Sequence, residues 1–188
     1  MTGFRPLEER VVHEWAVWKL VEADFASPDG ETFTRTFVRS PGAVGVVPLL
    51  FDPEGVPAVV LVRQYRPPLD ALMDEIPAGM RDVDGEPPEE TAQRELIEEV
   101  GMKAGRIELL TRFHNACGLT DADTHVFLAT ELEAVGHDRQ GPEERAMTVH
   151  QIALTDALAL VADGTITDAK TVMGLLLADQ RLRQREGR

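Results

Sequence analysis

The positions of the apolar and polar residues along the chain predict β-strands separated by helices. The expected strands are residues 33–38, 43–51, 58–66, 107–113, 124–132 and 147–154. Residues 43–51 and 58–66 are almost continuously apolar and flank a turn sequence, Asp52-Pro53-Glu54-Gly55. That pattern predicts a hairpin with both strands largely buried. Strands placed around helices favour a mixed α/β sandwich.

The first expected helix carries three acidic residues on one face. Pro88 suits the first helical position, where a missing N–H costs nothing, and Gly101 is a stop signal. Glu95, Glu98 and Glu99 stand at i, i+3 and i+4, so they lie side by side. Like charges at this spacing destabilise a helix by about 0.2–0.5 kcal/mol per pair. Carboxylates on a rigid element favour Mg²⁺ or Mn²⁺, whereas charge alone also fits a solvated acidic face.

Two further helices are expected near the C-terminus. The shorter one spans residues 156–163, between Thr155 and Gly164. The longer one runs from a cap at Thr167 to residue 183. The apolar residues expected to share its buried face are Val172, Met173, Leu176 and Leu177.

Residues 1–41 have the pattern of a small antiparallel β extension, and residues 42–188 that of the main domain. The segment Ser27-Pro28-Asp29-Gly30 is a strong turn signal before the strand at 33–38. A piece this small cannot bury both of its faces, so a second subunit is expected to cover one. Trp15 and Trp18 either pack within this extension or, more specifically, stack on a substrate base.

Composition and charge narrow the classes of protein to which the chain can belong. Its 188 residues fit one domain with a small appendage, and 43% of them are hydrophobic, enough to form a core. A formal charge of −14 argues against nucleic acid as a partner. No apolar run approaches the roughly 18 residues of a membrane span, and the N-terminus lacks a signal-peptide core. With Cys117 as its single cysteine, the chain is expected to be soluble and cytoplasmic.

The sequence from Gly79 to Met102, GMRDVDGEPPEETAQRELIEEVGM, resembles the Nudix box. The box has Gly, five residues, Glu, seven residues, and then Arg-Glu-apolar-x-Glu-Glu-x-Gly-apolar. Glu86 and residues 94–102 match, and one extra residue lies between Gly79 and Glu86. Three further segments resemble those of the ADP-ribose pyrophosphatase group: EIPAG at 75–79, CGLTDADTHVFLA at 117–129 and GTITDAKT at 164–171.

This resemblance implies an α/β/α sandwich with a mixed sheet and an N-terminal β extension that mediates a homodimer. It also implies hydrolysis of the diphosphate in ADP-ribose or a related nucleoside diphosphate sugar. ADP-ribose would give AMP and ribose 5-phosphate. By resemblance, Glu95 and Glu99 are the principal metal ligands, with Glu98 and the carbonyl oxygen of Ala78 contributing. The expected metal is Mg²⁺, with Mn²⁺ as the alternative.

Supporting and substrate-binding roles are expected outside these ligands. Arg94 is expected to hold a glutamate in place through a charge-assisted hydrogen bond. Glu86 supports either the loop or the outer metal shell. Arg63 and Arg66 stand at a strand end, where each either grips substrate phosphates or is an ordinary surface arginine. Trp18 is the candidate for contact with the base.

The resemblance also implies a general base beyond the acidic helix. The relatives carry a glutamate on a mobile loop that activates or positions the attacking water. Glu144 matches that place best, with Glu143 beside it as the alternative, and Glu98 completes the candidate catalytic group. Glu144 can also be an ordinary surface glutamate.

Three departures from the relatives leave the substrate open. Cys117 stands where a proline marks ADP-ribose specificity, Ala122 replaces a carboxylate, and Asp74 replaces a tryptophan. A pyrophosphatase of GDP-mannose or another sugar nucleotide is therefore a second hypothesis. A non-catalytic Nudix-like domain that senses a nucleotide is a third, although such domains typically lose box carboxylates that are present here.

Overall fold

The structure is a computed structural model that describes residues 3–137, 145–185 and 187. The chain divides into two compact units, each described by itself below. The first unit contains Met1–Gly42 together with His114–Asp123, and the second contains Ala43–Phe113 together with Thr124–Arg188. The segment 114–123, which the sequence analysis assigned to the main domain, therefore groups with the N-terminal unit.

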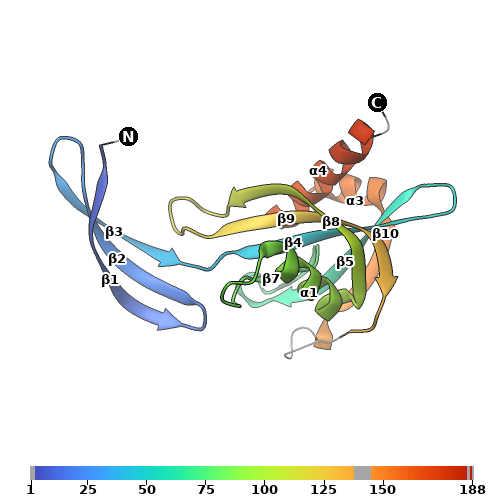
Figure 1. The fold of residues 1–188 in the computed structure, drawn as a ribbon, viewed down its shortest axis with the longest axis horizontal. Helices are drawn as coiled ribbons and strands as arrows, with labels where there is room; N and C mark the ends of the chain where they lie inside the picture. The colour runs from blue at the N-terminus through green and yellow to red at the C-terminus, as the bar shows by residue number, and fades with distance from the viewer. Residues whose placement is uncertain (1–2, 138–144, 186, 188) are drawn as a thin grey trace. The chain divides into compact units, whose positions relative to one another are not determined.

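The first unit is built on a three-stranded antiparallel sheet, which confirms the expected N-terminal β extension (Figure 1). Its strands are β1 (Arg5–Trp15), β2 (Trp18–Ala26) and β3 (Thr32–Arg39), paired in that order. The expected turn joins β2 to β3, with the Gly30 N–H donating to the Ser27 carbonyl at 3.0 Å. Gly30 has φ +90°, a conformation that suits a residue without a side chain. Every residue of β1 is exposed.

The segment 114–123 pairs with the end of β3. Val38 and Thr120 form a parallel bridge. Asp121 accepts hydrogen bonds from Arg39 Nη1 at 2.9 Å and from the Ser40 N–H at 3.0 Å. One carboxylate therefore holds the loop against the sheet of this unit.

The second unit is a seven-stranded mixed sheet with helices on both faces (Figure 1). Its main path runs β10-β5-β4-β9-β8, while β6 pairs with β5 and β7 with β4. β4 is parallel to β9 and antiparallel to β5 and β7. The bounds are β4 Ala43–Phe51, β5 Pro57–Arg66, β6 Ala71–Glu75, β7 Ala78–Met80, α1 Pro88–Val100, β8 Met102–His114, β9 Asp123–Ala134, β10 Thr148–Ala153, α3 Leu154–Ala162 and α4 Ala169–Arg185.

Two hydrophobic cores fill the two faces of this sheet. On one face, Ala92, Leu96 and Val100 of α1 pack against sheet residues that include Val46 and Phe127. On the other face, residues of α3 and α4 pack against Val47, Leu49, Val59, Leu61, Val126 and Leu128. Alternate residues of one strand thus enter opposite cores, as the pleat requires. The α/β/α sandwich with a mixed sheet is confirmed.

The structure corrects several element boundaries. β8 begins at Met102, directly after α1, rather than at 107. The short strands β6 and β7 were not expected, because Pro77 separates them and neither is long enough to show a period. α3 begins at Leu154, two residues before the expected start.

The orientation of α4 was also predicted wrongly. Asp168 rather than Thr167 caps the helix, because its carboxylate accepts the Thr171 N–H at 3.0 Å. The buried residues are Thr171, Gly174, Leu175 and Ala178, whereas Leu176 is 50% exposed. The buried stripe lies on nearly the opposite side of the helix from the expected one, because the small residues Thr171, Gly174 and Ala178 let the helix pack closely there. No helix in the described part of the chain is long and apolar enough to cross a membrane.

Candidate active site on the acidic helix

The helix α1 forms where the end signals place it. Pro88 is its first residue, Glu89 and Glu90 lie in its first turn, and Gly101 ends it at φ +69°. The acidic first turn complements the helix dipole, and the Gly101 N–H donates to the Ile97 carbonyl at 3.0 Å. The same helix buries an apolar stripe in the core of its face of the sheet, which fixes its rotation.

Glu95 and Glu99 lie at the edge of the buried stripe rather than in open solvent. They are only 8% and 4% exposed. Burial of two carboxylates one turn apart is costly unless cations or hydrogen-bond donors compensate. This position favours the metal-site interpretation over a solvated acidic face.

The strand β7 provides the surface on which these two carboxylates rest. The Ala78 N–H donates to Glu99 Oε2 at 2.8 Å. A Cβ added to Gly79 would lie 2.0 Å from the carboxyl carbon of Glu95, so only glycine leaves room for that side chain. β7 is held in turn by β4, with Gly45 opposite Ala78. The expected Ala78 and the two expected glutamates are therefore brought together.

Arg94 binds the acidic side chains around it, as the sequence predicts. Its Nη1 donates to Glu95 Oε1 at 2.7 Å and to Glu98 Oε2 at 3.3 Å. Its Nε and Nη2 each lie 3.3 Å from a carboxylate oxygen of Glu86. Burial alone would lower the pKa of Arg94, but the hydrogen bonds and charges of these glutamates raise it above its usual value. The guanidinium thus remains charged and fixes the rotamers of its partners.

Glu86 also belongs to this group of side chains. Its Oε2 accepts the Thr91 hydroxyl at 2.8 Å, so it ties the loop before α1 to the first turns of the helix. The hydrogen bond from Arg94 lowers the pKa of Glu86 below its ordinary value. The geometry supports the structural role considered for this residue.

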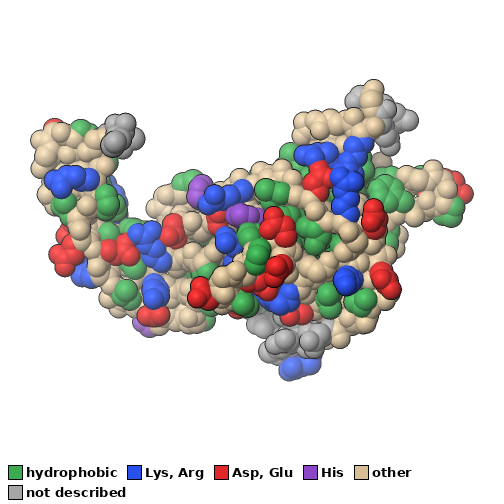
Figure 2. Space-filling view, viewed as in Figure 1, with side chains coloured by type: hydrophobic (Ala, Val, Ile, Leu, Met, Phe, Trp, Pro, Cys, Tyr) green, Lys and Arg blue, Asp and Glu red, His purple; other side chains and the backbone are tan. Residues whose placement is uncertain are grey.

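Several carboxylates gather around Arg94 at this site. Figure 2 shows acidic side chains gathered over α1. The carboxylates within 4 Å of Arg94 are Asp82, Glu86, Glu95 and Glu98, and Glu99 lies one turn beyond Glu95. Arg66 is also close enough to Glu99 for that charge to raise the pKa of Arg66. A divalent cation would bring further positive charge to these carboxylates.

The residues present fit such a cation. Glu95, Glu98, Glu99 and the Ala78 carbonyl carry hard oxygen atoms of the kind that Mg²⁺ binds, and Gly79 has no side chain that would meet the Glu95 carboxylate. Across residues 3–137, 145–185 and 187, no three His, Cys, Asp or Glu side chains converge as a finished metal cage. That is compatible with Mg²⁺, which binds through one or two carboxylates and completes its shell with water and substrate phosphates.

The remaining expected site residues lie in different environments. Arg63 Nη1 is 3.8 Å from Asp74 on an exposed part of β5. Arg66 is engaged by Glu75 through two hydrogen bonds of 2.7 Å each. Trp18 belongs to the first unit, where its ring lies 6.1 Å from that of Trp15. Glu143 and Glu144 lie outside the described residues.

Sequence reasoning missed one charged group of the second unit. Glu75 is 2% exposed and is bound by both Arg66 and Lys170. Its signal was present in the EIPAG and GTITDAKT segments, which the resemblance identified without assigning a role to either charged residue. No periodicity in the sequence links two segments that are about a hundred residues apart.

The fold and the site together define an α/β/α sandwich protein with a carboxylate-rich helix suited to a divalent cation. The model of the NUDIX domain matches residues 39–171. This chain belongs to the Nudix hydrolase family.

Named relatives and a solved structure agree with that assignment. The chain is 36% identical to an ADP-ribose pyrophosphatase of Bacillus subtilis over 176 residues, which cover 91% of this chain and 92% of that one. It is 35% identical to an ADP-ribose pyrophosphatase of Mycobacterium tuberculosis, covering 92% and 82%. A crystal structure of an ADP compounds hydrolase superimposes with a TM-score of 0.83 over 97% of this chain and 95% of its own. Its sequence identity is 22%, so it supports the fold alone.

Proposed function

We propose that this protein hydrolyses the diphosphate of ADP-ribose or a related nucleoside diphosphate sugar with the help of Mg²⁺. The observation that carries the proposal is the position of Glu95 and Glu99 against Ala78 and Gly79. The similarity to ADP-ribose pyrophosphatases over most of the chain supports ADP-ribose as the first candidate substrate. Hydrolysis of ADP-ribose would give AMP and ribose 5-phosphate.

The chemistry divides between the ion and the chain. A bound divalent ion neutralises the diphosphate charge and polarises a water molecule. Glu95, Glu99, Glu98 and the Ala78 carbonyl provide the oxygen donors that would hold it. Arg94 keeps Glu95 and Glu98 in fixed rotamers through the hydrogen bonds described above.

The remaining roles in the reaction rest on resemblance. Glu144, or its neighbour Glu143, is proposed to accept the proton of the attacking water. Arg63 and Arg66 are proposed to bind the phosphates, since a guanidinium offers paired donors to phosphate oxygens. Arg66 can do so only with the donors that Glu75 leaves available.

A GDP-mannose pyrophosphatase is the second candidate. A protein of that name from Yersinia enterocolitica is 32% identical over 142 residues, covering 71% of this chain and 72% of its own. Cys117 and Ala122 depart from the pattern of the ADP-ribose group. The substrate panel described below therefore has to identify the sugar and the base.

A homodimer formed through the N-terminal unit is part of the proposal. β1 is exposed along its whole length, although Leu7, Val11, Val12 and Trp15 are large and apolar. β1 is an edge strand of its sheet, so these exposed apolar residues lie where another chain can pack. A second copy of the chain would cover them.

A cytoplasmic location also remains a prediction.

A substrate panel tests the activity. ADP-ribose, GDP-mannose, ADP-glucose, NADH and diadenosine polyphosphates are incubated with the protein and Mg²⁺, each beside the Glu99→Gln variant. We expect Mg²⁺-dependent cleavage of ADP-ribose, with the variant almost inactive. Preference for another sugar nucleotide would change the proposed substrate but not the proposed mechanism. Tight nucleotide binding without turnover would support the hypothesis of a non-catalytic nucleotide sensor instead.

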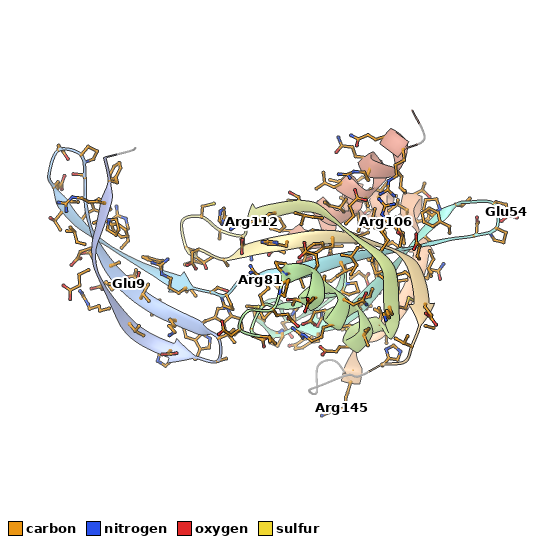
Figure 3. The ribbon with its side chains drawn as sticks, in the orientation of Figure 1. Glu9, Glu54, Arg81, Arg106, Arg112 and Arg145 are labelled. Carbon is orange, nitrogen blue, oxygen red and sulfur yellow. The ribbon has the colours of Figure 1, made fainter. Side chains whose placement is uncertain are left out.

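Light scattering after gel filtration tests the dimer. We expect the parent protein to elute at twice the chain mass of 20.7 kDa. The double variant Val11→Lys, Trp15→Lys should shift toward the monomer, because burying unpaired ammonium groups is costly. Glu54→Lys, on the exposed β4–β5 turn labelled in Figure 3, is the control with an added charge elsewhere. A monomeric parent would overturn the dimer.

A further inference from the structure

The first turn of α4 and the end of β6 are joined by a closed circuit of hydrogen bonds. Glu75 accepts a hydrogen bond from Lys170 Nζ, and Lys170 Nζ lies 2.9 Å from Asp168 Oδ2. The same Asp168 oxygen accepts the Thr171 hydroxyl at 2.6 Å. The Thr171 oxygen in turn accepts the Ile76 N–H at 2.9 Å. Two consecutive residues of one segment are thus held by two consecutive residues of another.

Glu75 is the buried charge of this circuit. At 2% exposure its carboxylate has lost its water, and isolated burial of a charge is strongly unfavourable. Two cations compensate for it: Arg66, through parallel hydrogen bonds, and Lys170, whose side chain is 14% exposed. Burial would raise the pKa of Glu75, but Arg66 and Lys170 hold it below its usual range. The carboxylate is therefore ionised and fixed from two directions.

Close packing brings α4 near enough to reach Glu75. A Cβ on Gly174 would lie 2.8 Å from the Val47 side chain and 3.2 Å from Ile76. A Cβ on Gly45 would lie 2.9 Å from Ile76. Two glycines thus make room for the Ile76 side chain between the helix and β4. The position of Ile76 is fixed by packing as well as by the hydrogen bond to Thr171.

The residues held by this circuit lead directly into the metal-site segment. Ala78 follows Ile76 by two residues, and its N–H donates to Glu99. Gly79 comes next and faces Glu95. The short segment 75–79 is therefore held by α4 at its first residues and contacts α1 at its last ones. Arg66, which Glu75 orients, is also close enough to Glu99 for that charge to raise the pKa of Arg66, after the larger effect of Glu75.

We propose that Lys170 and Thr171 are positioning residues that set the metal site from the opposite face of the sheet, through Glu75 and Ile76. The proposal rests on the proposed function, because it concerns the same metal site. The two residues fix where the Ala78 carbonyl and Gly79 meet the acidic helix. Lys170 also shares the charge of Glu75, which leaves Arg66 with positive charge for an incoming phosphate. This assigns a role to the GTITDAKT segment.

The main test compares Lys170→Met with Lys170→Arg and with Arg181→Met. Arg181 lies on the same helix and binds Glu108, which also lies 3.3 Å from Arg106, labelled in Figure 3. Arg181→Met thus removes the same charge from α4, away from the circuit. Mn²⁺ affinity is measured by electron paramagnetic resonance on the protein without substrate. The values of kcat and KM are measured at saturating metal, and folding is measured by circular dichroism.

Lys170→Met is expected to weaken Mn²⁺ binding by about 10-fold to 100-fold, which is typical when a group that supports metal ligands is removed. KM for the substrate should rise as Arg66 loses free charge. Lys170→Arg should restore most of both, and Arg181→Met should match the parent. If Lys170→Met lowers only the melting temperature, and leaves Mn²⁺ affinity, KM and kcat unchanged below it, the positioning role is overturned.

Thr171→Val and Thr171→Ser are the second pair and decide the question if Lys170→Met does not fold. Valine has the same shape but leaves the Ile76 N–H unpaired, whereas serine keeps the acceptor oxygen. Weaker Mn²⁺ binding in the valine variant alone supports the proposal, and equal binding in both overturns it. The Mn²⁺ measurement needs no substrate. If the parent protein does not hydrolyse the substrates but its Mn²⁺ binding still depends on Lys170, the proposed function is wrong and the positioning role is retained.

Discussion

Two groups of carboxylates in the second unit differ in how their charge is balanced. On α1, Glu95 and Glu98 stand with Glu86 and Asp82 around Arg94, and Glu99 lies one turn beyond Glu95. At the other group, Glu75 and Asp168 meet Arg66 and Lys170, so the formal charges cancel. Arg94 thus contacts four carboxylates in the first group, whereas two carboxylates meet two cations in the second.

The two groups of carboxylates have different proposed roles: the group on α1 binds a metal ion, and the group around Glu75 positions the chain. A balanced buried group stabilises one arrangement of the chain and needs nothing from outside. Carboxylates at helical spacing on a rigid helix repel each other, so a cation that binds among them relieves this repulsion. The proposed metal-binding group and the proposed positioning group therefore differ in the cations that their carboxylates contact, although both are rich in glutamate.

The largest expected effect comes from reducing the charge of the acidic helix. Glu99→Gln should lower kcat/KM by about 1,000-fold, since a catalytic metal contributes several kcal/mol and each 1.36 kcal/mol is tenfold in rate. Steady-state hydrolysis of ADP-ribose at several Mg²⁺ concentrations measures it. A variant that cleaves as fast as the parent would remove Glu99 from the metal site.

A smaller effect is expected from Gly79→Ala, which changes no charge. The new methyl group would displace the Glu95 carboxylate, because its Cβ would lie 2.0 Å from the carboxyl carbon. Mn²⁺ affinity and kcat/KM should each fall by about 100-fold. The control is Gly118→Ala, where a Cβ meets no atom within 4 Å. Unchanged Mn²⁺ affinity in Gly79→Ala would show that the position of Glu95 does not matter.

The balanced group should show itself in the dependence of stability on pH. The pKa of Glu75 is lowered on folding, so its contribution to the free energy of unfolding is complete above its unfolded value of about 4.3 and is lost as the pH falls through the lower folded value. Glu75→Gln should be less stable than the parent at neutral pH, because Arg66 and Lys170 lose their partner. The two stabilities should converge once the pH falls below the lowered pKa that Glu75 has in the folded protein. Thermal melts across that range measure this, and parallel curves would contradict it.

Local signals in the sequence predicted much of the fold and the acidic helix. Pro88 and Gly101 mark the ends of α1, and the spacing of three glutamates shows which residues share a face. All of these signals lie within one short segment, so the sequence alone predicted the helix. The hairpin of β4 and β5 was equally clear, because burial on both faces leaves a continuous apolar run.

The features that were missed depend on contacts between distant segments. Lys170 and Glu75 are 95 residues apart, and their pairing exists only because α4 packs on the sheet through Gly174. The same close packing buries the side of α4 nearly opposite to the expected one, so that Leu176 is exposed. Hydrophobic periodicity reports which residues are apolar, but not how small residues change the rotation of a helix.

The hydrogen bond from the Ala78 N–H to Glu99 has a consequence for spectroscopy. The chemical shift of an amide proton depends on the charge of the oxygen that accepts it, so this single proton registers how much of that charge Glu99 shares with another cation. In a ¹⁵N-labelled sample, the Ala78 resonance would follow a titration without substrate, product or an added probe. Its exchange with deuterium would report how often β7 and α1 separate. One backbone amide thus provides a natural label inside the protein.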